Sequence, residues 1–326
     1  MASAPTDTPD SAVAATAEPT TIEKLRGLRW SIASNAANTV FVQYTFFGSI
    51  FVLFLNELGL SKGQTGFLLS LLPFTGLISI FIAPAVARFG YKRTYVTAWA
   101  GRTVIATFML LTPWVAMTYG LDVTLIFISV TVAAFSLVRS IGMTANMPWV
   151  QEYVPDNMRG KYTATSNMFT SLVGFASVTV GGIVLSRVVG VPGFVILISV
   201  GVLGGFLSTW LASFIPGGAP VPNRPEQKRQ RELGAALRDS NYMRYLVGVA
   251  LLTLATGPLC SFLPLYMREE VGLSSGNIVL LQIGTLGGGL ATSFLWGWAA
   301  DRYGSKPVML WGLLLRMSLP VLWVLM

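Results

Sequence analysis

The chain has 326 residues, of which 53% are hydrophobic and only 11% charged, and its mean hydropathy is +0.64. A soluble domain of this size carries roughly a quarter charged residues, so the composition excludes an ordinary soluble protein. The net charge of +8 comes mainly from basic residues in short links between apolar blocks. Such a distribution indicates orientation in a lipid bilayer and not nucleic-acid binding. With no histidine and one cysteine, Cys260, the chain is predicted to hold no metal centre, no cofactor and no catalytic residue.

The first 22 residues are rich in Ala, Thr, Pro and Asp and contain no apolar core, which predicts a disordered tail and no cleaved signal peptide. Nine apolar blocks follow, and their lengths suit helices that cross a bilayer. These blocks are residues 31–55, 64–86, 94–118, 123–149, 161–186, 193–215, 244–267, 277–299 and 308–326.

One link is much longer than the others and divides the helices into two groups. It covers residues 216–243, opens with Pro and Gly and then becomes charged, which predicts a cytoplasmic linker. Within it, residues 225–240 are expected to form a surface helix with Leu233, Ala236 and Leu237 on its apolar side. The linker separates a six-helix bundle at 23–215 from the first three helices of a second bundle at 244–326.

The orientation of the predicted helices follows from the positions of Lys and Arg. If the N-terminus is cytoplasmic, sixteen basic residues fall on the cytoplasmic side, three on the outer side and three within the helices. We therefore predict a multi-pass protein of the cell (inner) membrane whose N-terminus is cytoplasmic.

Two segments of the first bundle return in the second. The segment ELGLSKGQ at 57–64 returns as EVGLSSGN at 270–277, and ARFGYK at 87–92 returns as DRYGSK at 301–306. The shifts are 213 and 214 residues, and each pair flanks the second helix of its bundle. A six-helix unit has therefore been duplicated, which is typical of secondary transporters.

The segment GWAADRYGSK at 297–306 places an acid and several cations around a glycine between two helices. At these residues the chain resembles the major facilitator superfamily, whose signature lies between the second and third helices of each half. The resemblance assigns a gating motif to Gly297, Asp301, Arg302, Gly304 and Lys306, and to Arg88, Gly90, Lys92 and Arg93 in the first copy. The first copy departs from the signature at Ala83 and Ala87, where the family has a glycine and an aspartate.

The same resemblance implies an all-α membrane protein with six plus six helices, of which about nine are present. It also implies transport by alternating access, with a solute site between the two bundles near the middle of the membrane. The alternative reading of the motif is a surface loop whose charges only set the orientation of the chain.

Several polar residues interrupt the predicted helices. Arg139 lies near the middle of the fourth helix with Asn146 two turns further on, and Arg102 lies in the third helix. The first helix carries a polar stripe of Asn35, Asn38, Thr39 and Gln43. Charged groups inside a bilayer are expensive and usually face a cavity, so these positions predict a solute site; alternatively, Arg102 binds backbone carbonyls and the stripe holds neighbouring helices together.

All fourteen acidic residues fall outside the interior of the first eight helices. Arg102 and Arg139 therefore have no intramembrane carboxylate to neutralise them there, although helices beyond residue 326 could supply one. Since a guanidinium binds carboxylates and phosphates through two parallel hydrogen bonds, we expect an anionic or strongly hydrogen-bonding solute at Arg139.

The sequence as a whole predicts a monomeric carrier of a small solute within the lipid bilayer, and it leaves the coupling ion open. Two other classes of protein fit the sequence less well. A membrane-embedded sensor or receptor should carry a folded soluble output domain, but the longest polar stretch is the linker at 216–243. An enzyme should carry a nucleophile, a base or a metal cluster, and the sequence offers no convincing one.

Overall fold

The computed structural model describes residues 20–74, 79–220 and 238–325, and every regular element in these ranges is helical. Most of the predicted tail and most of the predicted linker helix lie outside the described residues. Helix α1 (Thr21–Tyr44) begins at residue 21 and so includes the last two residues of the predicted tail. Its first turn is stabilised by a capping box, in which the side chains of Thr20 and Glu23 each accept a backbone N–H of the other.

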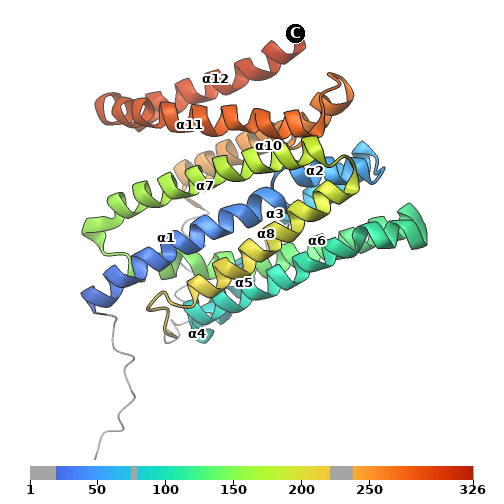
Figure 1. The fold of residues 1–326 in the computed structure, drawn as a ribbon. Coiled ribbons are helices and arrows are strands. Elements are labelled where there is room, and N and C mark those ends of the chain that lie inside the picture. Colours follow the sequence, from blue (N-terminus) through green and yellow to red (C-terminus); the bar gives the residue numbers. More distant parts are fainter. Residues whose placement is uncertain (1–19, 75–78, 221–237, 326) are drawn as a thin grey trace, which may run out of the picture.

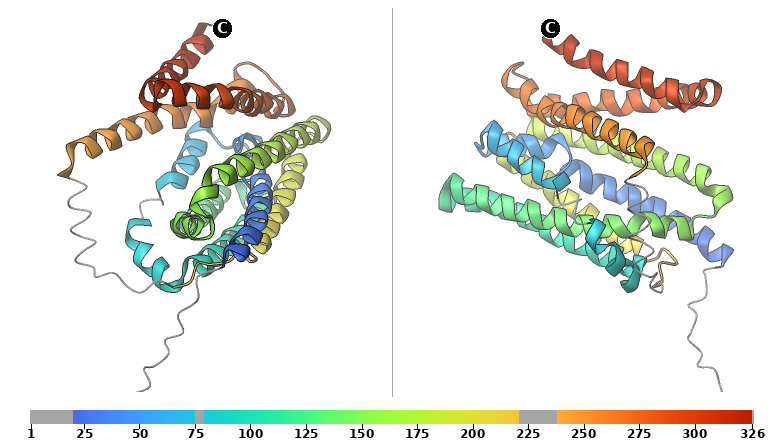
Figure 2. Two further views of the ribbon diagram at one scale, coloured as in Figure 1. Left: turned by 90° about the vertical axis from the view of Figure 1, so that its left-hand side faces the viewer. Right: turned by 180° about the vertical axis from the view of Figure 1, so that it is seen from behind.

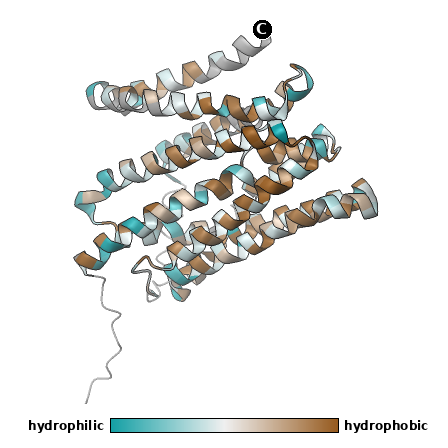
Figure 3. Cartoon of the chain, viewed as in Figure 1, coloured by the Kyte–Doolittle hydropathy of each residue, from teal (hydrophilic) through white to brown (hydrophobic). Residues whose placement is uncertain are grey.

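The first repeat continues through helices that follow the predicted spans. After α1 come α2 (Ser49–Glu57), α3 (Lys62–Phe74), α4 (Ser79–Phe89), α5 (Tyr91–Thr107), the 3₁₀ turn η2 (Phe108–Leu111), α6 (Thr112–Tyr153), the 3₁₀ turn η3 (Asp156–Met158), α7 (Arg159–Arg187) and α8 (Val191–Ala212). Four described stretches are long and apolar enough to cross a membrane: Ile22–Glu57, Tyr91–Tyr153, Asp156–Arg187 and Val191–Ala212. Figure 3 shows how apolar residues dominate along α6 and α8.

Two of these spans contain breaks. The single span predicted at 31–55 is divided into α1 and α2, with Gly48 as the residue before α2. A Cβ atom at Gly48 would lie 2.1 Å from the backbone oxygen of Gln43, so only glycine fits where the chain turns here. The long α6 also contains a turn at Gly120, whose φ of 82° lies in the left-handed region. This turn separates the third predicted span from the fourth.

The second repeat contributes α10 (Ser240–Glu269), α11 (Ser275–Tyr303) and α12 (Ser305–Leu325). In Figure 1 the turns between α2 and α3, α7 and α8, and α10 and α11 gather at the right, and α1 begins at the left. We call these the predicted outer end and the predicted inner end, after the bias in basic residues. Helix α11 packs along α7, and α10 packs on α2. In the left-hand view of Figure 2, the N-terminal end of α10 extends away from the first bundle.

The duplicated segments adopt the same local structure in both copies. Gly59 and Gly272, related by the shift of 213, have φ values of 87° and 74°. Gly90 and Gly304, related by the shift of 214, have φ values of 91° and 83°. These left-handed turns explain why glycine recurs at these positions in both repeats.

Close approach of α8 to α1 organises the first bundle. A Cβ atom at Gly205 would lie 2.6 Å from Cδ2 of Phe41 and 2.9 Å from Cγ2 of Thr103. A Cβ atom at Gly201 would lie 2.9 Å from Cβ of Tyr44. Small residues let membrane helices approach closely enough for van der Waals packing, since there is little hydrophobic driving force between helices in lipid. Phe41 and Tyr44 lie in the buried core that this contact completes.

We predict that Gly205→Leu lowers the melting temperature of the purified protein, because overpacking a close helix contact destabilises by about 1–3 kcal/mol. The matched control is Gly248→Leu on α10, where an added Cβ meets nothing within 4 Å. Tryptophan-fluorescence melts in detergent measure both variants. Equal melting temperatures for the two variants would contradict the close α1–α8 contact.

Candidate functional site

The positively charged side chain of Arg102 on α5 is buried within the first bundle. Its side chain is 2% exposed, and its Nη2 donates a hydrogen bond to Oδ1 of Asn38 on α1. Its guanidinium carbon lies 3.7 Å from the ring centroid of Trp99 and 4.7 Å from that of Phe41. Aromatic faces attract a guanidinium through cation–π interactions, which are stronger in a water-free setting. One neutral amide and two aromatic rings therefore surround a charge that no described carboxylate neutralises.

Arg139 on α6 is more accessible than Arg102. It is half-buried, and its guanidinium carbon lies 4.6 Å from the ring centroid of Phe47. Phe47 stands in the break between α1 and α2 and is itself 39% exposed. No described carboxylate forms an ion pair with Arg139, and its charge is close enough to that of Arg102 for the two to repel. Asn146 lies two turns further along α6 and is also half-buried.

The polar stripe of α1 contacts two different helices. Asn38 faces Arg102 on α5, whereas Nδ2 of Asn35 donates to Oγ of Ser166 on α7 at 3.2 Å. Gln43 also faces α7, since a Cβ atom at Gly174 would lie 3.7 Å from its Nε2. The structure thus brings Asn38 and Arg102 together, but no described hydrogen bond joins Arg139 to Asn35, Asn38 or Gln43.

The two repeats meet at the predicted outer end in a contact that we call the outer seam. It joins α2 and α7 of the first repeat to α10 and α11 of the second, and the start of α3 takes part through Lys62, which lies against Glu269. Glycines bring α7 and α11 together: a Cβ atom at Gly182 would lie 2.5 Å from Cγ of Leu280, and one at Gly276 would lie 2.8 Å from the backbone oxygen of Gly182.

Charged side chains bridge the outer seam. Nζ of Lys62 lies 2.6 Å from Oε2 of Glu269 and 3.7 Å from Oε1 of Glu270, while Nη2 of Arg268 lies 3.1 Å from Oε2 of Glu57. The hydrogen bond and negative charge of Glu269 raise the pKa of Lys62 above its usual value, so this lysine keeps its charge at neutral pH. Beside Arg268 and Glu57, a cavity of about 160 Å³ is lined by residues of both repeats.

The sequence alone assigns no role to these seam residues. The segments 57–64 and 270–277 served only as evidence of duplication, although they carry most of the bridging charges. The available signal was the presence of both charge signs in two loops that a duplicated architecture places at the same end of the bundle.

The motif loop of the first repeat is fastened to the beginning of the linker. The backbone N–H of Lys92 donates to the oxygen of Gly218 at 3.2 Å, and the N–H of Gly218 donates to Oε1 of Glu152 at 2.9 Å. A Cβ atom at Gly90 would lie 2.8 Å from that same Gly218 oxygen. The side chain of Arg93 is exposed. Arg88 lies in the last turn of α4, and its side chain is also exposed.

The motif loop of the second repeat has a different environment. Gly304 separates α11 from α12, and the guanidinium carbon of Arg302 lies 5.7 Å from the ring centroid of Trp298. Arg302 and Lys306 are exposed. The backbones of Gly297 and Asp301 belong to α11, but the side chain of Asp301 lies outside the described residues.

The fold and its seam define a polytopic helical membrane protein built from two repeats. The family model of the Major Facilitator Superfamily matches residues 34–326. The chain therefore belongs to the major facilitator superfamily, which is a family of membrane transporters and not of enzymes. This confirms the family predicted from the two motif loops.

One solved structure supports the same fold. It is a bacterial homologue of the human lysosomal transporter Spinster, in an inward-facing and unoccupied conformation, and it matches with a TM-score of 0.57 and 17% sequence identity. The match covers 88% of this chain and 64% of that chain, so this chain spans less than two thirds of the length of that transporter. No curated protein matches the chain.

We predict that Asn38→Ala destabilises the first bundle more than Asn35→Ala does. The first substitution leaves a buried charged donor of Arg102 without its acceptor, which costs about 1–3 kcal/mol or more, whereas the second removes a neutral hydrogen bond worth about 1 kcal/mol. Thermal melts in detergent measure the difference. A larger loss for Asn35→Ala would show that Asn38 does not hold Arg102 in place.

Proposed function

We propose that the protein carries a small solute across the membrane by alternating access. The observation that supports this is the uneven contact of α10 with the first repeat, which is close at the outer seam and is lost toward the beginning of the helix. At the outer end of α10, Leu265 and Met267 are 3% and 9% exposed. Toward the beginning of the same helix, Tyr245 is 61% and Leu251 is 65% exposed. A carrier that is closed at the outer end and open at the inner end has this distribution of contacts.

The motif loops belong to the same proposal. In a carrier that alternates, the inner ends of the repeats approach when the outer seam opens, and the cations of the two motif loops then come near the opposite repeat. Arg88, Lys92 and Arg93 would hold the inner gate from the first repeat, and Asp301, Arg302 and Lys306 from the second. Gly90 and Gly304 provide the turns that present these side chains.

For the solute, we propose an anion that binds Arg139. Arg102 is buried, donates one hydrogen bond to Asn38 and lies against two aromatic rings, so it is a poor candidate for direct binding even though its buried Nε has no described hydrogen-bond partner. Arg139 is half-buried, has an aromatic ring on one side and lies near a second positive charge. A buried cation in this setting gains most from a ligand that brings negative charge, and a carboxylate or phosphate matches the guanidinium fork. Asn146 on the same helix, and Asn35 and Gln43 on α1, remain proposed polar neighbours of this site.

We predict that Arg139→Gln abolishes anion binding and that Arg139→Lys weakens it at least tenfold, because lysine keeps the charge but loses the fork. A thermal-shift screen of small carboxylates, phosphates, amines and sugars against the purified wild type identifies the ligand. The same compound is then titrated against both variants. If only amines or sugars stabilise the wild type, or if Arg139→Gln binds as the wild type does, the anion proposal is wrong.

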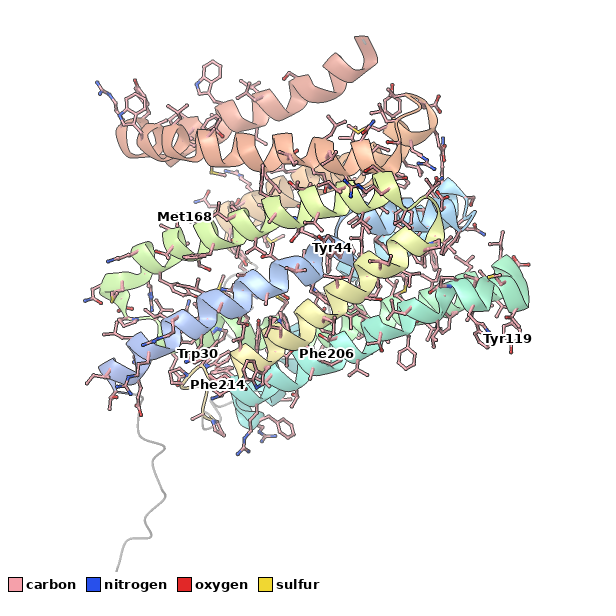
Figure 4. All side chains as sticks on the ribbon, viewed as in Figure 1. Trp30, Tyr44, Tyr119, Met168, Phe206 and Phe214 are labelled. Carbon is pink, nitrogen blue, oxygen red and sulfur yellow. The ribbon has the colours of Figure 1, made fainter. Side chains whose placement is uncertain are left out.

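We also predict that Gly182→Leu opens the outer seam, because the added side chain collides with Leu280 and the backbone of Gly276. Spin labels at Tyr119→Cys and Val271→Cys, in a Cys260→Ser background, report the distance between the repeats at this end. Figure 4 shows Tyr119 at that end of the first repeat. The control is Gly160→Leu on the same helix, where an added Cβ meets nothing within 4 Å. Equal distance distributions in the two variants would contradict a seam that closes by glycine contact.

A further inference from the structure

The ion pairs of the outer seam are related by the sequence duplication. Glu57 of the first repeat corresponds to Glu270 of the second at the shift of 213, and Lys62 corresponds to Ser275. Lys62 is the first residue of α3 and Ser275 is the first residue of α11, so the correspondence holds in the structure as well as in the sequence. The residues before them, Ser61 and Ser274, accept the backbone N–H of Gln64 and of Asn277 in the same way.

If the two repeats faced each other with full two-fold symmetry, each cross-seam contact would occur twice. Lys62 of the first repeat contacts Glu270 of the second at 3.7 Å, beside a shorter contact of 2.6 Å with Glu269, whose counterpart in the first repeat is the uncharged Asn56. The symmetric copy of this contact would join residue 275 to Glu57, but Ser275 is short and carries no charge. Arg268 fills this gap: its Nη2 lies 3.1 Å from Oε2 of Glu57, and its Nη1 donates to Oγ of Ser275 at 2.6 Å.

The first repeat has no equivalent of Arg268. The position that corresponds to it at the shift of 213 is Leu55, whose side chain is buried in the apolar core. The arginine is therefore specific to the second repeat, and it reaches both the acid and the serine that a symmetric lysine would have linked.

We infer that the outer seam is closed by two symmetry-related charge contacts, and that Arg268 supplies in the second repeat the cation that Lys62 supplies in the first. Arg268 is thus a positioning residue, because it holds Glu57 and the start of α11 together. It thereby sets the fraction of protein molecules that are closed at the outer end. This inference rests on the proposed function, because a seam contact controls a population only if the seam opens.

The two contacts should differ in strength. The side chains of Arg268 and Glu57 are 32% and 24% exposed, whereas that of Lys62 is 58% exposed. Exposed ion pairs change an equilibrium by about two- to fivefold, and shielding from water and salt strengthens a pair. Loss of Arg268 should therefore shift the ratio of closed to open protein by about fivefold, and loss of Lys62 by less.

The test is an exchange of the cation between positions. Arg268→Leu introduces the residue that the first repeat has at this position, and it should raise the open fraction at the Tyr119–Val271 spin-label pair. Adding Ser275→Lys to this variant introduces the lysine of the first repeat, and it should return the distribution toward that of the wild type. Arg187→Leu is the control, since it removes an arginine at the same predicted end that forms no described ion pair. Glu57→Gln, which preserves shape, should open the seam as Arg268→Leu does.

The outcomes separate this inference from the proposed function. If Arg268→Leu opens the seam and Ser275→Lys restores closure, the exchange of cations is supported. If Arg268→Leu and Glu57→Gln behave like Arg187→Leu, or if Ser275→Lys restores nothing, the inference is wrong while alternating access stands. A second label pair at Lys161→Cys and Tyr245→Cys reports the predicted inner end. If neither pair shows a second distance in any variant, alternating access itself fails.

Discussion

A guanidinium buried among membrane helices needs partners, and in the described residues those of Arg102 are an amide and two aromatic rings, while its buried Nε has no described hydrogen-bond partner. Asn38 accepts one hydrogen bond, and Trp99 and Phe41 present their ring faces. This arrangement joins α1 to α5 through a single charge, so both helices must keep their register for the hydrogen bond from Arg102 to Asn38 to persist. The neighbouring Arg139 has one aromatic ring and no described carboxylate. The difference between the two sites is what makes Arg139 the candidate for a ligand.

Glycine residues allow helices to approach closely both within the first bundle and across the outer seam. Within the first bundle, Gly205 leaves room for Phe41 and Thr103, and Phe41 belongs to the buried core. Across the outer seam, Gly182 and Gly276 bring α7 and α11 together with the same closeness. The seam differs because partly exposed ion pairs lie beside it, and each such pair contributes little free energy. A contact formed from closely packed backbones and weak ion pairs can be well packed when closed and still open at a modest cost in free energy.

Much of the fold follows from the sequence, because the bilayer restricts both helix length and the placement of charge. The apolar blocks, the duplicated loops and the motif glycines were all identifiable without the structure. The break between α1 and α2 was not, since nothing in the apolar run marks Gly48 as the point where α2 begins. The different environments of Arg102 and Arg139 were also hidden, because helix periodicity gives a face but not the neighbour that covers it. The seam partners required the packing of one repeat on the other.

The two motif loops have kept the same backbone turn since the duplication, but their side chains differ. Gly90 and Gly304 keep the same left-handed turn, yet Ala87 stands where the second copy has Asp301. In the first repeat, Glu152 of α6 supplies a nearby carboxylate, and it binds the backbone of Gly218 at the beginning of the linker. Gly218 in turn accepts the N–H of Lys92. The first loop is therefore connected to the segment that joins the repeats, so a displacement of the linker would move this loop directly, whereas the second loop has no such described attachment.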